Sequence, residues 1–162
     1  WTLSAIDLDL ADYHFVDVGS GWGYALAVAG VYPFRHLTGI EFAGEFHDMA
    51  CANFDNLARN GTIDRDRVTL LHASALETEL PPGPLMILLA NPFGEAVMRP
   101  FLERVADSHR RNPRPITILY VNPKHASLFG RDDVVEIPLK GPSAQLLRWF
   151  GPYPVRVFCW HD

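Results

Sequence analysis

The sequence has few cysteines, no long apolar run and no large excess of charge, and each shortage excludes a class of protein. Cys51 and Cys159 are its only cysteines and do not form a C-x-x-C pair, so neither a disulfide framework nor a thiolate zinc site is encoded. Its apolar runs are broken by Gly and Pro well short of the ~20 residues that a membrane helix needs, so we expect no membrane contact. The net charge of −5 disfavours nucleic acid as a partner, because phosphate backbones attract cations.

Targeting and metal-binding signals are also missing. No basic and apolar leader is visible, and together with the few cysteines this predicts a cytoplasmic protein. The chain opens at Trp1 rather than Met, and we expect an N-terminus that has been processed or trimmed. The seven histidines are scattered without acidic or Cys partners at metal-ligand spacing, so we expect no metal site.

The remaining composition is that of an ordinary globular domain. Hydrophobic residues make up 48% of the 162 residues and charged residues 20%. A chain of this length buries roughly 70% of its unfolded surface, which is enough for a hydrophobic core. We therefore expect a single domain over residues 1–162.

Short apolar runs alternate with helical stretches along the chain. The expected strands are 14–18, 37–41, 67–72, 85–90, 116–121, 134–139 and 155–160. The expected helices are 24–31, 45–60 with Phe46, Met49, Ala50, Leu57 and Ala58 on its apolar stripe, and a third one marked by Phe101, Leu102 and Val105. Pro100 is best placed in the first turn of that third helix, where its missing N–H is not needed.

Strands that are apolar on both faces and separated by helices predict an α/β fold with a doubly wound, mostly parallel sheet. The last two predicted strands lack a convincing helix between them, so we expect them to form an antiparallel pair at one edge.

The strongest functional signal is the glycine-rich segment that follows the first predicted strand. It reads Asp17-Val-Gly19-Ser20-Gly21-Trp-Gly23 and opens a helix. Alternate glycines allow a sharp turn and let a ligand touch the backbone without meeting a Cβ. A dinucleotide site uses G-x-G-x-x-G and holds pyrophosphate, whereas here the glycines are spaced more closely and an acid precedes them. A carboxylate there repels phosphate and suits a cationic ligand.

This segment resembles motif I of the class I S-adenosylmethionine (SAM) methyltransferases, an acidic residue followed by G-x-G-x-G. The resemblance implies the seven-stranded Rossmann-like methyltransferase sheet, with an antiparallel last strand, and SAM as cofactor. The domain at 1–162 would then lack the upstream helices from which that family often builds its substrate lid. The cofactor-binding residues that it implies in this segment are Asp17, Gly19, Ser20, Gly21, Gly23 and Tyr24.

Two further segments carry the resemblance, at places where the family contacts the adenosyl part of SAM. Glu41 ends the second predicted strand, where an acidic residue of the family binds the ribose hydroxyls; NAD enzymes use the same device, so Glu41 indicates a nucleoside rather than SAM in particular. Phe42 follows it and is expected to lie against adenine. The family often has an acid after the third strand; this chain departs from that with Ser74, although Ser74 or the backbone of Ala75 offers a hydrogen bond.

The last signal is Asn91-Pro92-Phe93, after the fourth predicted strand. Because a proline follows, we expect Asn91 to be extended and to present its amide at the carboxyl edge of the sheet. Amino-group methyltransferases carry Asn/Asp-Pro-Pro-aromatic there, which implies catalytic roles for Asn91 and Phe93 on an acceptor nitrogen. The glycine loop and this motif are also faintly similar to the histone-lysine methyltransferases of the disruptor-of-telomeric-silencing type. Asn122-Pro123 shows that such a turn also occurs for structural reasons.

The sequence therefore predicts a SAM-dependent methyltransferase whose acceptor, a small molecule or a protein, is not identified by any motif. Two alternatives stay open. One is a module of the same fold that binds SAM or a nucleoside without catalysis. The other is an NAD-dependent oxidoreductase, against which the glycine spacing and Asp17 argue.

Overall fold

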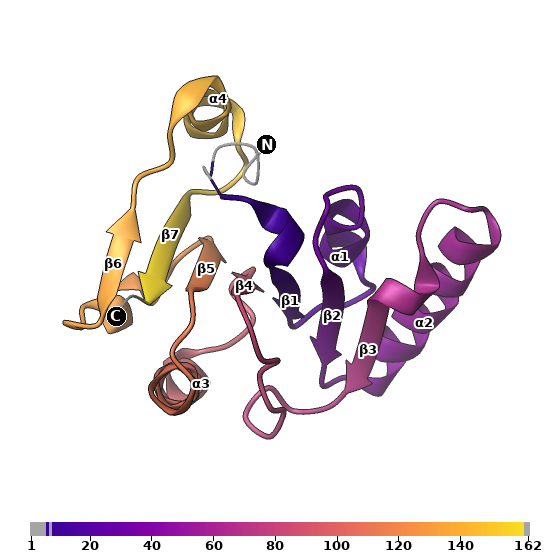
Figure 1. Cartoon of the computed structure of the whole chain (residues 1–162), viewed down its shortest axis with the longest axis horizontal. Helices are drawn as coiled ribbons and strands as arrows, with labels where there is room; N and C mark the ends of the chain where they lie inside the picture. Colours follow the sequence, from indigo (N-terminus) through magenta and orange to yellow (C-terminus); the bar gives the residue numbers. More distant parts are fainter. Residues whose placement is uncertain (1–5, 7, 161–162) are drawn as a thin grey trace.

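The strands form one seven-stranded sheet with helices on both faces (Figure 1). The computed structural model describes residue 6 and residues 8–160, and the side chains of 146–150 are outside this description. The strands are β1 (His14–Val18), β2 (His36–Glu41), β3 (Val68–His72), β4 (Leu85–Leu89), β5 (Ile116–Val121), β6 (Val134–Ile137) and β7 (Val155–Trp160). The helices are α1 (Tyr24–Ala29), α2 (Gly44–Arg59), α3 (Glu95–Arg111) and α4 (Gly141–Phe150), with short 3-10 turns η2 (Leu10–Asp12), η3 (Arg65–Arg67) and η4 (Ala126–Phe129).

The strand order is β3-β2-β1-β4-β5-β7-β6, and β7 runs antiparallel to both of its neighbours. The first five strands are parallel, so their carboxyl ends meet at one edge of the sheet. The sequence-based prediction of a doubly wound, mostly parallel sheet with an antiparallel last strand is confirmed. The strand order reverses between β1 and β4, so the connections after these two parallel strands diverge, and open α/β sheets bind ligands at such a point.

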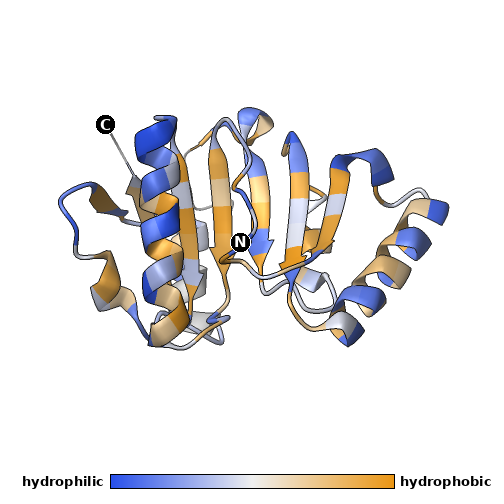
Figure 2. Ribbon diagram, turned by 90° about the horizontal axis from the view of Figure 1, so that it is seen from below, coloured by the Kyte–Doolittle hydropathy of each residue, from blue (hydrophilic) through white to orange (hydrophobic). Residues whose placement is uncertain are grey.

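The core has two halves, one on each face of the sheet. Successive residues of a strand point to opposite faces, and in β4 Met86 packs on one side while Ile87 packs on the other. The α1 and α2 side contains Leu26 and Phe54, and the other side contains the apolar face of α3. In Figure 2 the strands are largely hydrophobic and α3 turns hydrophilic residues outward. Among the described residues, no helix combines the length and apolar character needed to cross a membrane.

The structure corrects two predictions about helices. The prediction that no helix joins β6 to β7 is wrong, because α4 lies between them, with Pro142 in its first turn, where a proline is tolerated. The placement of Pro100 in the first turn of α3 is also wrong. The helix begins earlier, at Glu95, so Pro100 is inside it. Its ring is on the exposed face, where water can satisfy the carbonyl that loses its helical partner.

The predicted apolar stripe of α2 is correct only in part. Ala50 is buried as expected, and the other fully buried side chain is Phe54. Phe46 and Met49, which were placed on the stripe, are 43% and 46% exposed. A helix turns by 3.6 residues, so a face centred on positions 50 and 54 leaves positions 46 and 49 at its margin. Two large apolar side chains therefore face outward near the carboxyl edge of the sheet.

Candidate functional site

A pocket of about 310 Å³ opens at the carboxyl ends of β1, β2 and β4. It lies where the glycine-rich turn after β1 meets the connections that follow β2, β3 and β4. Its lining residues are Gly19, Gly21, Ile40, Glu41, Phe42, Ala43, Phe46, Ala73, Ala75, Pro92 and Phe93. The only ionisable side chain among them is that of Glu41. Small and aromatic residues form the rest of the wall, as is usual in a ligand pocket.

The glycine-rich turn uses its own amide groups to hold itself in place. The amides of Gly19 and Ser20 both donate to the carbonyl of Ile40 in β2, at 2.9 and 3.1 Å. The amide of Gly23 donates to the carbonyl of Ser20 at 2.8 Å. Gly21 donates to a carboxylate oxygen of Glu41 at 2.8 Å. Four N–H groups of the turn are therefore occupied within the protein.

Two of the glycines are required by their neighbours as well as by their backbone angles. Gly19 has φ +73°, and a Cβ built on it would lie 2.8 Å from the Cβ of Pro92. Gly23 has φ +81°, and its Cβ would lie 2.7 Å from the ring of Phe54. Both contacts are too short for any side chain, and both φ values strain L-residues. Gly19 thus brings the first turn against the Asn-Pro turn after β4.

Glu41 holds the floor of the pocket. Its carboxylate accepts from the amide of Gly21 through Oε2 and from the amide of Ala43 through Oε1, both at 2.8 Å. An ionised carboxylate offers about four lone-pair positions, so about two remain for hydroxyl donors from a ligand. Glu41 therefore joins the turns after β1 and β2 and still has the capacity predicted for it.

Asp17 is buried beneath the pocket rather than on its wall. It is the fourth residue of β1, opposite Gly39 in β2, and only 3% exposed. Burial and, to a smaller degree, the nearby Glu41 carboxylate together raise the pKa of Asp17 to about 7. Near pH 7 this carboxyl is therefore partly protonated, and a cation bound close to it would favour its ionised form.

The Asn91-Pro92-Phe93 segment contributes Pro92 and Phe93 to the wall but not the side chain of Asn91. The prediction that Asn91 is extended is wrong, since its φ is +54°. A positive φ also avoids the right-handed helical region that a following proline excludes, and Asn tolerates it better than most residues. Asn122, before Pro123, does the same with φ +52°. The Oδ1 atom of Asn91 is buried without a hydrogen-bond partner.

Other predicted residues lie close to the pocket but outside its lining. Ser20 is 8% exposed, and its Oγ would meet a Cβ built on Gly39, so it packs against β2. Tyr24 is 81% exposed on α1. Ser74 accepts through its Oγ from the amide of Leu76 and stabilises the turn after β3. Ala75 lines the pocket beside it.

Sequence reasoning did not identify five of the lining residues. They are Ile40, Ala43, Phe46, Ala73 and Pro92. Ala43 directly follows Phe42 and Ala73 directly precedes Ser74, so both could have been included by adjacency. The sequence predicts Phe46 on the buried stripe of α2. In the structure, the rotation of that helix places Phe46 at the pocket instead.

Many solved structures are similar to this fold. A methylase of Haemophilus influenzae superposes with a TM-score of 0.66 at 14% identity, over 94% of this chain and 89% of that one. The StiE O-MT segment has a TM-score of 0.61 at 12% identity, over 96% and 70%. The DhpI protein, solved as a DhpI-SAM-HEP complex, has a TM-score of 0.55 at 12% identity, over 99% and 84%.

These similarities define the class I methyltransferase fold for this chain. No family model matches the sequence, and the search of curated proteins finds no match. At sequence identities of 12–14%, these comparisons show a common fold and nothing beyond it. The narrower resemblance to the disruptor-type lysine methyltransferases gains no support from the three structures compared above.

Proposed function

We propose that this protein is a SAM-dependent methyltransferase that binds SAM in the pocket between the glycine-rich turn and Glu41. The main observation in support of the proposal is that backbone amides of the glycine-rich turn donate hydrogen bonds to acceptors within the protein. Gly19, Ser20, Gly21 and Gly23 all donate within the protein, so these four N–H groups are not offered to a pyrophosphate. A dinucleotide turn depends on such donors. A ligand that carries an ammonium and a sulfonium instead needs carbonyls, carboxylates and ring faces.

The residues present fit such a ligand. Gly21, with nothing within 4 Å of a Cβ built on it, permits close approach of a ligand, and Glu41 has lone pairs left for the two ribose hydroxyls. Phe42 and Phe93 offer ring faces to adenine and to the acceptor. The pocket volume lies at the lower end of the range usual for small-molecule sites. The solved DhpI-SAM-HEP complex, which shares the fold, supports this choice of cofactor.

The chemical task of the protein is orientation. Bound SAM supplies an activated methyl carbon with a good leaving group. Glu41 would then hold the ribose end of the donor, Asp17 would act on its cationic end through charge from beneath the pocket, and Phe93 with Pro92 would limit the approach of the acceptor to one side. Residues that hold an acceptor close to the methyl group of bound SAM would remove part of the entropic cost of bringing the two reactants together. No nucleophile of the enzyme is needed for a direct displacement.

An amino nitrogen is the acceptor that the Asn-Pro-Phe segment supports best. The Asn91 Oδ1 atom has no partner in the protein, and an unpaired buried acceptor costs free energy until a donor reaches it. A rotation of the Asn91 side chain toward the pocket would present this oxygen to an acceptor N–H. Such a hydrogen bond would turn the nitrogen lone pair toward the methyl carbon.

Calorimetric titration with SAM, S-adenosylhomocysteine and NAD tests the cofactor. We expect SAM and S-adenosylhomocysteine to bind and NAD not to bind, and binding of NAD alone would refute the proposal. Glu41→Gln removes charge and one acceptor, and we expect SAM affinity to fall about 10- to 100-fold. Glu45→Gln, on the exposed first turn of α2, is the matched control and should retain affinity.

Catalysis needs its own measurement. Incubation with methyl-labelled SAM and a cell extract, followed by separation of labelled products, should yield a labelled acceptor. If SAM binds tightly but no label is transferred over a broad range of conditions, the protein is a SAM-binding module and not an enzyme.

A further inference from the structure

Large apolar side chains continue from the pocket onto the outer surface. Phe42 and Phe46, which line the pocket, are 77% and 43% exposed. Trp22 is 56% exposed, its ring lies 6.2 Å from that of Phe46, and its carbonyl accepts from the side chain of Asn53 on α2. Met49, one turn after Phe46, is also exposed. We call Trp22, Phe42, Phe46 and Met49 the aromatic rim.

The apolar surface does not end at the rim. Tyr24 and Val28, one turn apart on α1, are 81% and 45% exposed. Tyr24 is two residues after Trp22 in the chain and begins α1. An acceptor confined to the mouth of the pocket would not reach α1. Exposed apolar groups over two helices are more typical of a surface that binds a polypeptide.

The charges around the rim are all negative. Glu45 and Asp48 are exposed on the first turns of α2, on the same face as Met49. Glu41 lies at the floor of the pocket. The segments 19–24, 41–58, 72–76 and 90–98, which follow β1 to β4 at this edge, contain no Lys or Arg.

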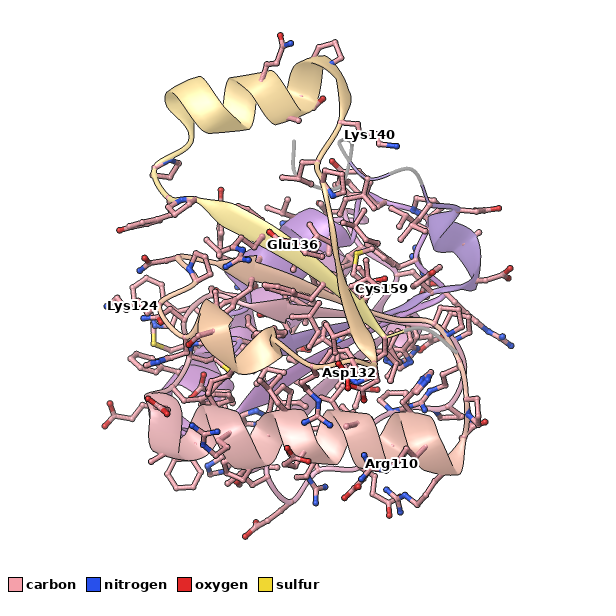
Figure 3. All side chains as sticks on the ribbon, turned by 90° about the vertical axis from the view of Figure 1, so that its left-hand side faces the viewer. Arg110, Lys124, Asp132, Glu136, Lys140 and Cys159 are labelled. Carbon is pink, nitrogen blue, oxygen red and sulfur yellow. The ribbon has the colours of Figure 1, made fainter. Side chains whose placement is uncertain are left out.

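The Lys and Arg residues lie outside these four segments. Arg59 is at the far end of α2, and Arg110 and Arg111 are at the far end of α3. Figure 3 shows Arg110 toward one end of α3 and Lys124, on the connection after β5, above the other end. Arg99, near the start of α3, forms an ion pair with Glu95. The rim is therefore an aromatic surface in a negative field, which attracts cations and repels phosphates.

We propose that the aromatic rim, together with Glu45 and Asp48, binds a basic segment of a partner protein, one in which Lys or Arg alternates with apolar residues. Aromatic faces take up the cations and the apolar side chains, and the two carboxylates add long-range attraction. That the bound segment is also the methyl acceptor rests on the proposed function, since the rim adjoins the pocket through Phe42 and Phe46.

Fluorescence anisotropy with three labelled synthetic peptides tests the inference. The first peptide alternates Lys and Leu, the second Glu and Leu, and the third Lys and Ser. We expect only the first to bind tightly, with an affinity that falls as salt rises, because exposed charges are screened. Equal binding of the Glu-Leu or the Lys-Ser peptide would overturn the inference. So would binding of phenethylamine at the rim with no binding of any peptide.

Matched variants locate the contact. Trp22→Ala should weaken binding of the Lys-Leu peptide about three- to tenfold. The double variant Glu45→Gln/Asp48→Asn should weaken it by a similar factor. Val135→Ala and Asp132→Asn, on the exposed β6 side of the molecule, should leave the affinity unchanged. Losses of equal size in both sets would show that binding is not specific to the rim.

The two proposals fail separately. Trp22, Glu45, Asp48 and Met49 are outside the pocket lining, so their contribution to peptide binding can be measured in the absence of a donor. Peptide binding without SAM binding would reject the methyltransferase proposal and keep the basic partner. SAM binding without peptide binding would do the reverse.

Discussion

Gly19 lies against Pro92 so closely that a Cβ added to the glycine would be 2.8 Å from the Cβ of the proline. The contact joins the turn after β1 to the turn after β4, two segments that belong to different halves of the sheet. Both residues line the pocket, so their contact forms part of its wall. A single hydrogen atom as side chain is therefore a structural requirement of the site.

Gly19→Ala should damage both stability and ligand binding. The methyl group must displace Pro92, and alanine at φ +73° costs about 1–2 kcal/mol in strain. We expect unfolding free energy to fall by roughly 2–4 kcal/mol, because strain and clash add, and SAM affinity to fall more than tenfold. Urea denaturation and calorimetry measure the two effects.

Gly61→Ala is the control for that variant. Gly61 has φ +67° and nothing within 4 Å of an added Cβ, so Gly61→Ala introduces the same kind of backbone strain as Gly19→Ala but no clash. We expect a stability loss of about 1–2 kcal/mol with unchanged SAM affinity. A Gly19→Ala protein that binds SAM normally would mean that the pocket is elsewhere.

SAM binding should depend on pH through Asp17. In the free protein the pKa of Asp17 is raised to about 7, and a cationic ligand favours the carboxylate. Affinity should therefore rise with pH, by up to about tenfold per unit, below pH 7 and level off above it. Calorimetry near pH 6 in buffers of different ionisation enthalpy should detect proton release. Asp17→Asn should bind more weakly and lose this pH dependence.

Asp17 should also make the unliganded protein less stable in neutral solution. Its pKa rises from 3.8 to about 7 on folding, so the folded state binds more protons in that interval. Unfolding free energy then falls as pH increases from about 4 to about 7 and is constant above. Asp17→Asn removes this loss, and we expect it to be more stable than the wild type by roughly 2–4 kcal/mol at pH 8. At pH 4 the two proteins should unfold at similar urea concentrations, whereas a difference independent of pH would exclude ionisation as the cause.

His72 is a positioning residue for the pocket wall. Its Nε2 lies 3.1 Å from the carbonyl of Phe42, to which it donates, and its ring stacks on that of His47 at 5.4 Å. His72→Ala releases this carbonyl, and we expect SAM affinity, or KM for SAM, to weaken about three- to tenfold with little change in kcat. His72→Gln keeps an N–H donor and should restore most of the affinity.

His125→Ala, on the connection after β5, is the matched histidine control. It should leave SAM affinity unchanged. Equal losses in His72→Ala and His72→Gln would indicate that ring stacking with His47 matters more than the hydrogen bond.

The parts of the site that sequence could predict are those encoded by neighbouring residues. Alternating apolar runs and turn residues determine strands and helices locally, so the strand boundaries agree with the structure to within two residues at each end. Asp17, the glycines and Glu41 lie at ends of such strands, and parallel strands bring these ends to a single edge. Motif position was therefore enough to predict Gly19, Gly21, Glu41 and Phe93 as neighbours.

The tertiary structure alone decided how those neighbours interact. The partners of Glu41 are amides from two different turns, the burial of Asp17 depends on the strands beside it, and the exposure of Phe46 depends on how α2 is rotated against the sheet. Each of these is a distance between segments far apart in the chain, which residue spacing does not encode. For the same reason the Asn91 side chain, expected on the pocket wall, proved to be set by a left-handed backbone angle that the Asn-Pro pair permits but does not dictate.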